Sequence, residues 1–309
     1  MNDEAKMLTI FAVPKAFRGH IEIIQRNAIR SWTRIQPRPE ILLLGDDPGT
    51  EQVAREFGLR HCPDIERNEF GTPLLSDIFD RAAKEATNNL LCYVNSDIIF
   101  PTTLSETIAK IRFKKFVIIG QRWDLDNENP VDFEDPKWEQ KLNDRRKAEA
   151  KLHEPTGIDY FIYPRGCYEN ILPFALGRGI WDNWLVFRGR LSAIPVIDAT
   201  RMITVIHQNH DYGSGPEDAK WICEGPERQA NLELAGGYSS AFTIDDTNFV
   251  ILPEGLKRRG LTKKRLDREM HLLAKRHTWL AFGINFFWKI LKRIDRWFSK
   301  KRTIHNATG

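Results

Sequence analysis

The stretch "LLCYVNSDIIFP", residues 90–101, places three small polar residues inside an otherwise apolar run. The apolar part favours a buried strand, and Asp97 follows it closely. A buried carboxylate is costly unless a cation or several hydrogen-bond donors compensate it. Mg²⁺ and Mn²⁺ prefer oxygen ligands and commonly bind one or two carboxylates together with substrate phosphates. Asn95 and Asp97 therefore predict a site for a divalent cation that carries a diphosphate.

Polar residues also follow two other predicted strands. Asp46 and Asp47 come after "EILLL", and Arg122 comes after "FVIIG". Carboxylates and a guanidinium at neighbouring strand ends suit a polar ligand, and Arg122 could bind a phosphate through two hydrogen bonds. Strand-end acids are also common as helix caps and turn formers, and Arg122 could instead pair with Asp124 or Asp126. Both interpretations stay open.

Two histidines, His207 and His210, follow the apolar residues of "MITVIHQNH" and precede Asp211. A strand places residues three apart on opposite faces, so joint metal binding requires a bend after Ile206. A structural histidine that binds a neighbouring loop is the alternative for at least one of them. We favour His207 as the ligand because it directly follows the apolar strand.

The segment "GIWDNWLV" places Asp182 between Trp181 and Trp184 at the predicted start of a helix. Partial desolvation by the aromatic rings would raise the pKa of the carboxyl toward the range of a general base. Aromatic walls also suit the apolar faces of sugar rings. The alternative is that Asp182 caps the helix while both tryptophans belong to the core.

These residues must be positioned by an alternation of strands and helices up to about residue 120. The apolar runs predict strands at 7–13, 40–47, 90–97 and 116–123, and helical spacing predicts helices at 21–32, 50–58 and 72–86. Apolar strands separated by helices indicate a parallel sheet covered on both faces, with ligands at the carboxyl ends of the strands. Residues 125–155 predict a loop and an exposed helix, and strand character returns at 157–166 and 196–213.

The 309 residues are 41% hydrophobic and 28% charged, as in an ordinary soluble globular protein. Four cysteines without CxxC spacing argue against a disulfide framework or a zinc-thiolate site and favour a reducing compartment. The first residues lack the basic start and apolar core of a signal peptide, so we expect a cytoplasmic protein.

The charge is unevenly distributed along the chain. Residues 257–302 hold 16 Lys and Arg against three acids, a net charge of +13, while the rest holds 30 against 39, a net charge of −9. We therefore expect a main domain at 1–256 and a basic tail at 257–309. Residues 279–302 predict an amphipathic helix that suits the surface of an anionic membrane, with packing on the main domain as the alternative. Its large apolar stripe argues against nucleic acid as a partner.

The stretch "YVNSDIIF" resembles the DxD motif of GT-A fold glycosyltransferases, with Asn95 in place of the first acid and Asp97 as the second. One carboxylate in place of two predicts weaker metal binding through this motif. "ILLLGDDPGT" resembles the segment that contacts the nucleotide base, which implies that Asp46 or Asp47 binds the base. The implied fold is a Rossmann-type mixed α/β sheet covered by helices.

Further segments follow in the order of that family over about residues 8–212. "YPRG" resembles a glycine-containing loop that faces the donor sugar, which implies donor-binding roles for Arg165 and Gly166. "GIWDNWLV" resembles the motif of the catalytic base, here Asp182, and "VIHQNHDYG" resembles the late metal ligand, His207 or else His210. The neighbouring Trp181, Trp184 and His210 are expected on the acceptor side.

The resemblance is to the inverting, family 2-like branch. It implies transfer of a sugar from a nucleotide-diphosphate donor, most commonly a UDP-sugar, with Mn²⁺ or Mg²⁺ as cofactor. A glycan or lipid-linked acceptor, in polysaccharide biosynthesis at the inner face of a membrane, would agree with the basic tail. Two other functions stay open. One is a metal-dependent phosphoesterase built on the histidines with Asp97 and Asp211, and the other is a non-catalytic module that binds nucleotide sugars.

Overall fold

The computed structural model describes residues 7–210, 220–222 and 224–277. The chain divides into two compact units, residues 1–259 and 260–309. The predicted boundary between residues 256 and 257 falls inside strand β13 (Gly255–Arg258), and helix α9 (Lys263–Arg276) belongs to the second unit. The amphipathic helix predicted at 279–302 lies outside the described residues. No helix in the described ranges is long and apolar enough to cross a bilayer.

Nine strands of the described chain form one mixed sheet in the first unit. In spatial order they are β13, β12 (Phe249–Leu252), β10 (Val196–Asp198), β6 (Val117–Ile119), β9 (Tyr160–Pro164), β4 (Leu90–Val94), β1 (Leu8–Ala12), β2 (Glu40–Leu44) and β3 (Arg60–Cys62). β1 pairs in parallel with β2 and β4, whereas β9 runs antiparallel to both β4 and β6. The mixed sheet of the predicted fold class is therefore confirmed, and the wholly parallel sheet expected from the first strands is wrong at β9.

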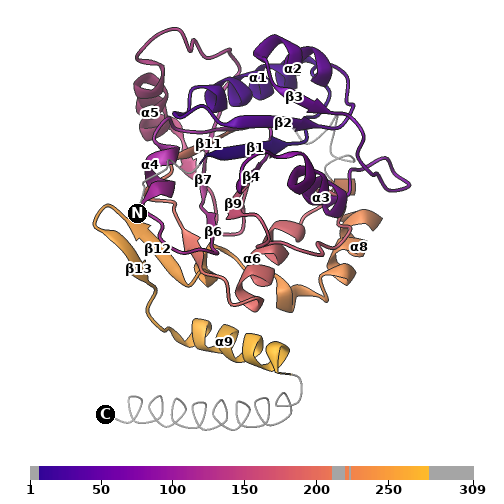
Figure 1. The fold of residues 1–309 in the computed structure, drawn as a ribbon, viewed down its shortest axis with the longest axis vertical. Coiled ribbons are helices and arrows are strands. Elements are labelled where there is room, and N and C mark those ends of the chain that lie inside the picture. The colour runs from indigo at the N-terminus through magenta and orange to yellow at the C-terminus, as the bar shows by residue number, and fades with distance from the viewer. Residues whose placement is uncertain (1–6, 211–219, 223, 278–309) are drawn as a thin grey trace, which may run out of the picture. The chain divides into compact units, whose positions relative to one another are not determined.

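Helices cover both faces of this sheet (Figure 1). They are α1 (Gly19–Thr33), α2 (Thr50–Phe57), α3 (Leu75–Glu85), α4 (Leu104–Ala109), α6 (Trp181–Leu191) and α8 (Pro226–Leu234), with short 3-10 helices at Tyr238–Ser240 and Ile244–Asp246. All five residues of β1 and all five of β4 are buried, because side chains of both faces are covered.

The two faces of the sheet have different cores because successive side chains of a strand point to opposite sides. On one face, aliphatic side chains such as Ile10 and Val94 pack with α1, α2 and α4. On the other face, aromatic rings dominate. Phe11 and Tyr93 pack edge-on against each other with ring centroids 5.6 Å apart, and Phe11 contacts Phe79 of α3 at 5.3 Å.

A smaller sheet stands beside the first and contributes to the site. Its strands, in spatial order, are β5 (Ile98–Ile99), β11 (Val205–Gln208), β7 (Arg122–Leu125) and β8 (Lys151–Leu152), and α5 (Trp138–Glu149) packs against it. Two sequence expectations are corrected here. Arg122 begins a strand of its own, and His207 lies inside β11 because the strand continues to Gln208. In this register His207 pairs with Asp124 of β7 and with Ile98 of β5.

Candidate active site

A cleft of about 600 Å³ opens at the carboxyl ends of β1, β2 and β4. Its volume is in the range of pockets that hold a small organic ligand. The parallel strands explain its position, because the segments that follow them all arrive at the same edge of the sheet. Several predicted site residues line the cleft: Asp47, Asn95, Asp97, Arg122, Trp181, His207 and His210.

Asp97, His207 and His210 form a group whose potential ligand atoms all lie within 4.8 Å of one another. The Nε2 atom of His210 is 3.1 Å from Asp97 Oδ2, and that of His207 is 3.7 Å from the same oxygen. The histidines converge because β11 ends at Gln208, so the bend required for joint binding exists two residues later than predicted. Both His207 and His210 therefore reach Asp97.

The donor set fits a divalent cation. Asp97 Oδ1 is buried and has no hydrogen-bond partner among the described residues, which is costly for a carboxylate oxygen unless a ligand compensates it. Two imidazoles and one carboxylate suit Mn²⁺ better than Mg²⁺, because imidazole is a softer ligand than the oxygens that Mg²⁺ prefers.

The charges in this group stabilise an ionised Asp97. Burial by itself would raise the pKa of the carboxyl, but His207, His210 and Lys15 outweigh burial and lower the pKa to about 2. In the opposite sense, burial would lower the pKa of His207, whereas Asp97 and Asp124 raise it. The carboxylate is thus available as a ligand at neutral pH, and a bound metal would compete with the proton of His207.

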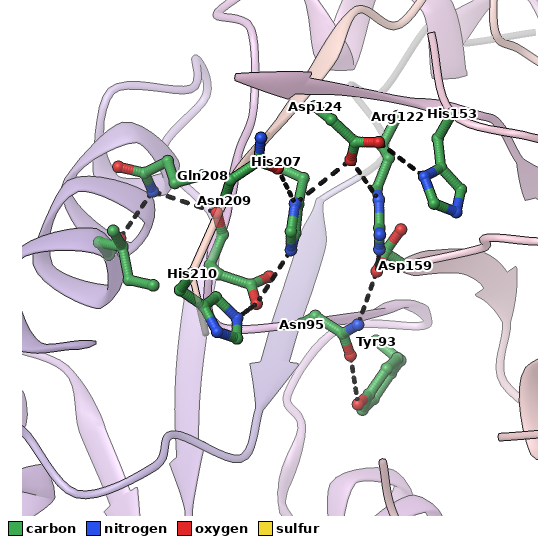
Figure 2. Close-up of polar contacts among 12 residues, drawn as sticks. Tyr93, Asn95, Arg122, Asp124, His153, Asp159, His207, Gln208, Asn209 and His210 are labelled. Carbon is green, nitrogen blue, oxygen red and sulfur yellow. Dashed lines mark hydrogen bonds and ion pairs between the residues drawn. The ribbon is translucent and has the colours of Figure 1, made fainter. Parts of the chain in front are cut away.

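His207 is oriented by residues behind it, as Figure 2 shows. Its Nδ1 lies 3.3 Å from Asp124 Oδ1, and Asp124 also accepts hydrogen bonds from Arg122 Nε at 2.9 Å and pairs with His153 Nδ1 at 2.6 Å. A carboxylate behind a histidine fixes the ring, as is usual for metal-binding histidines. The ion pair between Arg122 and Asp124 is one of the two alternatives left open by the sequence.

Gln208, which is wholly buried, fixes β11 to its surroundings. Its side-chain amide donates to the carbonyl oxygens of Ile24 at 2.8 Å and Asp97 at 3.1 Å, and its oxygen accepts from Asn27 at 2.9 Å and Asn127 at 3.0 Å. This residue therefore links α1, the Asp97 segment and β11, and it holds the segments that carry Asp97 and His207 in register.

Asn95 lies beside this group but binds protein atoms (Figure 2). Its oxygen accepts a hydrogen bond from the Tyr93 hydroxyl at 2.8 Å, and its Nδ2 donates to Asp159 Oδ1 at 2.8 Å. Arg122 Nη1 donates to the same Asp159 oxygen at 2.7 Å. Asp159, which also lines the cleft, was missed from the sequence, although an acid directly before the apolar strand "YFIYP" was a usable signal.

At the other end of the cleft, Arg67 joins the two acids that follow β2. Its Nη2 is 2.9 Å from Asp46 Oδ1 and 2.8 Å from Asp47 Oδ2. Asp47 and Arg67 line the cleft, whereas the Asp46 side chain is 71% exposed and is not among the described lining residues. Of the two predicted base-binding acids, Asp47 is therefore the better placed.

Asp182 lies in the first turn of α6. Burial, aided by the negative charge of Asp159, raises the pKa of its carboxyl to about 7, although backbone N–H groups of Asn183 and Ile158 oppose the shift. Its neighbour Trp181 lines the cleft and packs edge-on against Tyr93 with ring centroids 5.4 Å apart. The carboxyl thus has the pKa that a general base needs near neutral pH.

Five predicted site residues are not among those that line the cleft: Asp46, Asp182, Trp184, Arg165 and Gly166. Trp184 is 6% exposed and packs against Phe174 at 5.1 Å, so it is a core residue, which was the stated alternative. Arg165 and Gly166 follow β9, whose last residue pairs with Leu90 at the start of β4. Because β9 is antiparallel, they lie at the opposite edge of the sheet. There Arg165 Nη2 donates to the carbonyl oxygens of Ala86 at 2.8 Å and Asn88 at 3.1 Å.

No protein-family model matches the chain, and no curated protein is similar to it in sequence. Among solved structures, residues 1–349 of S. aureus TarS in complex with UDP-GlcNAc superpose with a TM-score of 0.52 at 14% identity, covering 89% of this chain and 73% of that one. Glucosyl-3-phosphoglycerate synthase from Mycobacterium tuberculosis, in complex with Mn²⁺, UDP and phosphoglyceric acid, gives 0.43 at 12% identity, covering 75% and 79%. The chain therefore has the GT-A-like fold that "YVNSDIIF" predicted.

Proposed function

We propose that this protein is a glycosyltransferase that uses a nucleotide-diphosphate sugar. One observation carries the proposal. A single cleft connects the Asp47–Arg67 pair to the group of Asp97, His207 and His210. A nucleoside at the first end would place its diphosphate at the second, where a cation can neutralise it. The similarity of fold to TarS, which was crystallised with UDP-GlcNAc, supports UDP as the first nucleotide to test.

In this proposal Asp97, His207 and His210 hold the cation, with Mn²⁺ favoured over Mg²⁺ by the two imidazoles. The bound ion would supply positive charge to the leaving diphosphate. Lys15 lines the same cleft and acts electrostatically on Asp97, so it adds a second positive charge near the diphosphate.

The proposed reaction inverts the anomeric carbon. Asp182 removes the proton of the acceptor hydroxyl while the hydroxyl oxygen attacks the anomeric carbon. The bond between that carbon and the diphosphate oxygen breaks, and its electron pair stays on the diphosphate. Trp181 forms the adjacent wall of the cleft and offers an apolar surface to a sugar ring.

A glycan or lipid-linked acceptor in polysaccharide biosynthesis, reached from the inner face of a membrane, extends the proposal. Its support is the sequence of residues 279–302, whose apolar stripe and basic flank suit an anionic surface. A cytoplasmic location agrees with the free thiols of Cys62, Cys92 and Cys167.

Thermal unfolding with UDP, GDP, dTDP or CMP, each with and without Mn²⁺, tests the proposal. A ligand at a hundred times its Kd should stabilise the fold by about 2.7 kcal/mol and raise Tm by several degrees. We expect one diphosphate to do so in the presence of Mn²⁺. Asp97→Asn should abolish the response, while Asp80→Asn, which removes an exposed acid from α3, should retain it.

Failure has two distinct forms. If no nucleotide stabilises the protein, the transferase proposal is wrong, and a phosphoesterase using Asp97, His207 and His210 becomes the better hypothesis. If a nucleotide sugar binds but is neither transferred nor hydrolysed with any glycan acceptor, the chain is a binding module.

A further inference from the structure

Asn95 stands where the resemblance leads one to expect a carboxylate, and the structure gives a physical reason. Its Nδ2 donates to Asp159 Oδ1 at 2.8 Å, and its backbone N–H donates to the Asp159 carbonyl oxygen at 2.9 Å. An aspartate at position 95 would bring two buried carboxylates to hydrogen-bond distance without a proton between them. Such a pair cannot be ionised on both sides at neutral pH. The amide at position 95 is therefore matched to the acid at position 159.

Asp159 is held firmly by one of its two oxygens only. The Oδ1 atom accepts from both Asn95 and Arg122, while Oδ2 is buried and has no partner among the described residues. The residue is 3% exposed and contributes to the lining of the cleft. A buried carboxylate oxygen without a donor is destabilising, so a bound molecule with a hydroxyl group would satisfy it.

The position of Asp159 indicates which part of a donor it would meet. On the side of the cation group, Asp159 binds Arg122, which binds Asp124, which in turn contacts His207. On its other side, the negative charge of Asp159 acts on Asp182. In the proposed reaction the diphosphate lies at the metal and the general base lies next to the anomeric carbon. The sugar ring of the donor must lie between these two points.

We propose that Asp159 Oδ2 accepts a hydrogen bond from a hydroxyl group of the donor sugar, and that Asn95 is the positioning residue that fixes Asp159 for this contact. The proposal rests on the function proposed above. The acid that is missing from position 95 is then supplied by Asp159, which lies directly before β9 and 64 positions later in the sequence. The proposal also assigns the pair to selection of the sugar, since the nucleoside lies at the Asp47 end.

The test compares UDP with UDP-glucose and UDP-N-acetylglucosamine by isothermal titration calorimetry in the presence of Mn²⁺. Asp159→Asn is the decisive variant, because an asparagine oxygen can still accept from Asn95 and Arg122 while an NH₂ group replaces Oδ2. We expect Kd for the preferred UDP-sugar to rise about tenfold to hundredfold, the usual value of a charge-assisted hydrogen bond. Kd for UDP should stay within about threefold of the wild type. Asp80→Asn is the control for removal of one negative charge.

The exchange variant Asn95→Asp/Asp159→Asn separates recognition from a merely structural role. In it the asparagine introduced at position 159 donates through Nδ2 to the aspartate introduced at position 95, so the side-chain oxygen at position 159 takes the place of Oδ2 and again faces the cleft, while Arg122 keeps Asp124 as its partner. We expect it to bind UDP normally and to recover part of the affinity for the UDP-sugar that Asp159→Asn loses. Failure of the exchange variant to recover any sugar affinity while it binds UDP normally would overturn the proposal, as would equal weakening of UDP and UDP-sugars in Asp159→Asn, or no change in either. If wild-type protein fails to bind UDP and both UDP-sugars, the proposed function is what fails.

Discussion

Replacing Asp182 with asparagine should change how the stability of the fold depends on pH. The folded protein holds the pKa of this carboxyl at about 7, whereas an unfolded chain returns it to about 3.8. Between these two values the folded state binds a proton that the unfolded state has released. The free energy of unfolding therefore falls as the pH rises through this window. The stabilisation that the Asp182 proton gives to the folded state is fully present only below about pH 4.

The magnitude follows from the two pKa values. Each unit of pKa difference corresponds to about 1.4 kcal/mol, so the raised pKa of Asp182 lowers the free energy of unfolding, relative to its value below pH 4, by roughly 4 kcal/mol at pH 8 and by roughly 2 kcal/mol at pH 5. An asparagine does not titrate. The difference in unfolding free energy, Asp182→Asn minus wild type, should thus increase by about 2–3 kcal/mol from pH 5 to pH 8. Lost or gained hydrogen bonds add an offset that does not depend on pH.

Urea unfolding followed by tryptophan fluorescence at pH 5, 6, 7 and 8, at constant ionic strength, measures this difference. Other titrating groups, including Asp97 and Asp124, contribute equally to both proteins and cancel. Asp80→Asn is the matched control and should show a difference that is flat with pH, because its side chain is exposed. A flat difference for Asp182→Asn would refute the reasoning, since Asp182 would then ionise normally. In the wild type, the same pKa predicts that kcat/KM falls as the pH decreases below about 7.

Two further substitutions test the assignments made at the edges of the sheet. His210→Gln should weaken Mn²⁺ binding at least tenfold in calorimetry, because it removes a potential ligand atom that lies 3.1 Å from Asp97 Oδ2. The control is His61→Gln, which should bind Mn²⁺ as the wild type does because His61 contacts the Gly45 carbonyl oxygen at 2.8 Å. Equal Mn²⁺ affinity in both variants would exclude His210 as a ligand. Arg165→Gln should lower the free energy of unfolding by about 1–2 kcal/mol, because the hydrogen bonds from Arg165 to two backbone carbonyl oxygens are lost. Kd for UDP should stay unchanged. A higher Kd for UDP in this variant would show that Arg165 does contact the donor.

The elements that the sequence predicted best are those with a strong local signal. The first, second and third predicted strands became β1, β2 and β4, because short, mostly apolar runs have few alternatives in a covered sheet. Helix α2 ends before Gly58 as predicted, since this glycine adopts the left-handed conformation that stops a helix. β3, with the sequence Arg-His-Cys, has no apolar alternation and gave no such signal.

Within the site, the sequence identified groups but not their partners. Asp97 was found because a carboxylate beside an apolar strand demands compensation, and both histidines were found through their spacing. The residues that complete them come from distant segments: Asp124 for His207, Arg67 for Asp47 and Asp159 for Asn95. Local periodicity carries no information on such pairings, because they depend on which strands become neighbours.

One misassigned direction accounts for both a false positive and an omission. An apolar run predicts a strand but not which way it runs, and a parallel β9 would have delivered the residues after it, Arg165 and Gly166, to the ligand edge. Because β9 is antiparallel, those residues lie at the far edge, and the residue before the strand reaches the cleft instead. That residue is Asp159, which now pairs with Asn95. The acid that appeared to be missing from "YVNSD" is therefore present at the same edge of the sheet, supplied by the residue directly before the neighbouring strand.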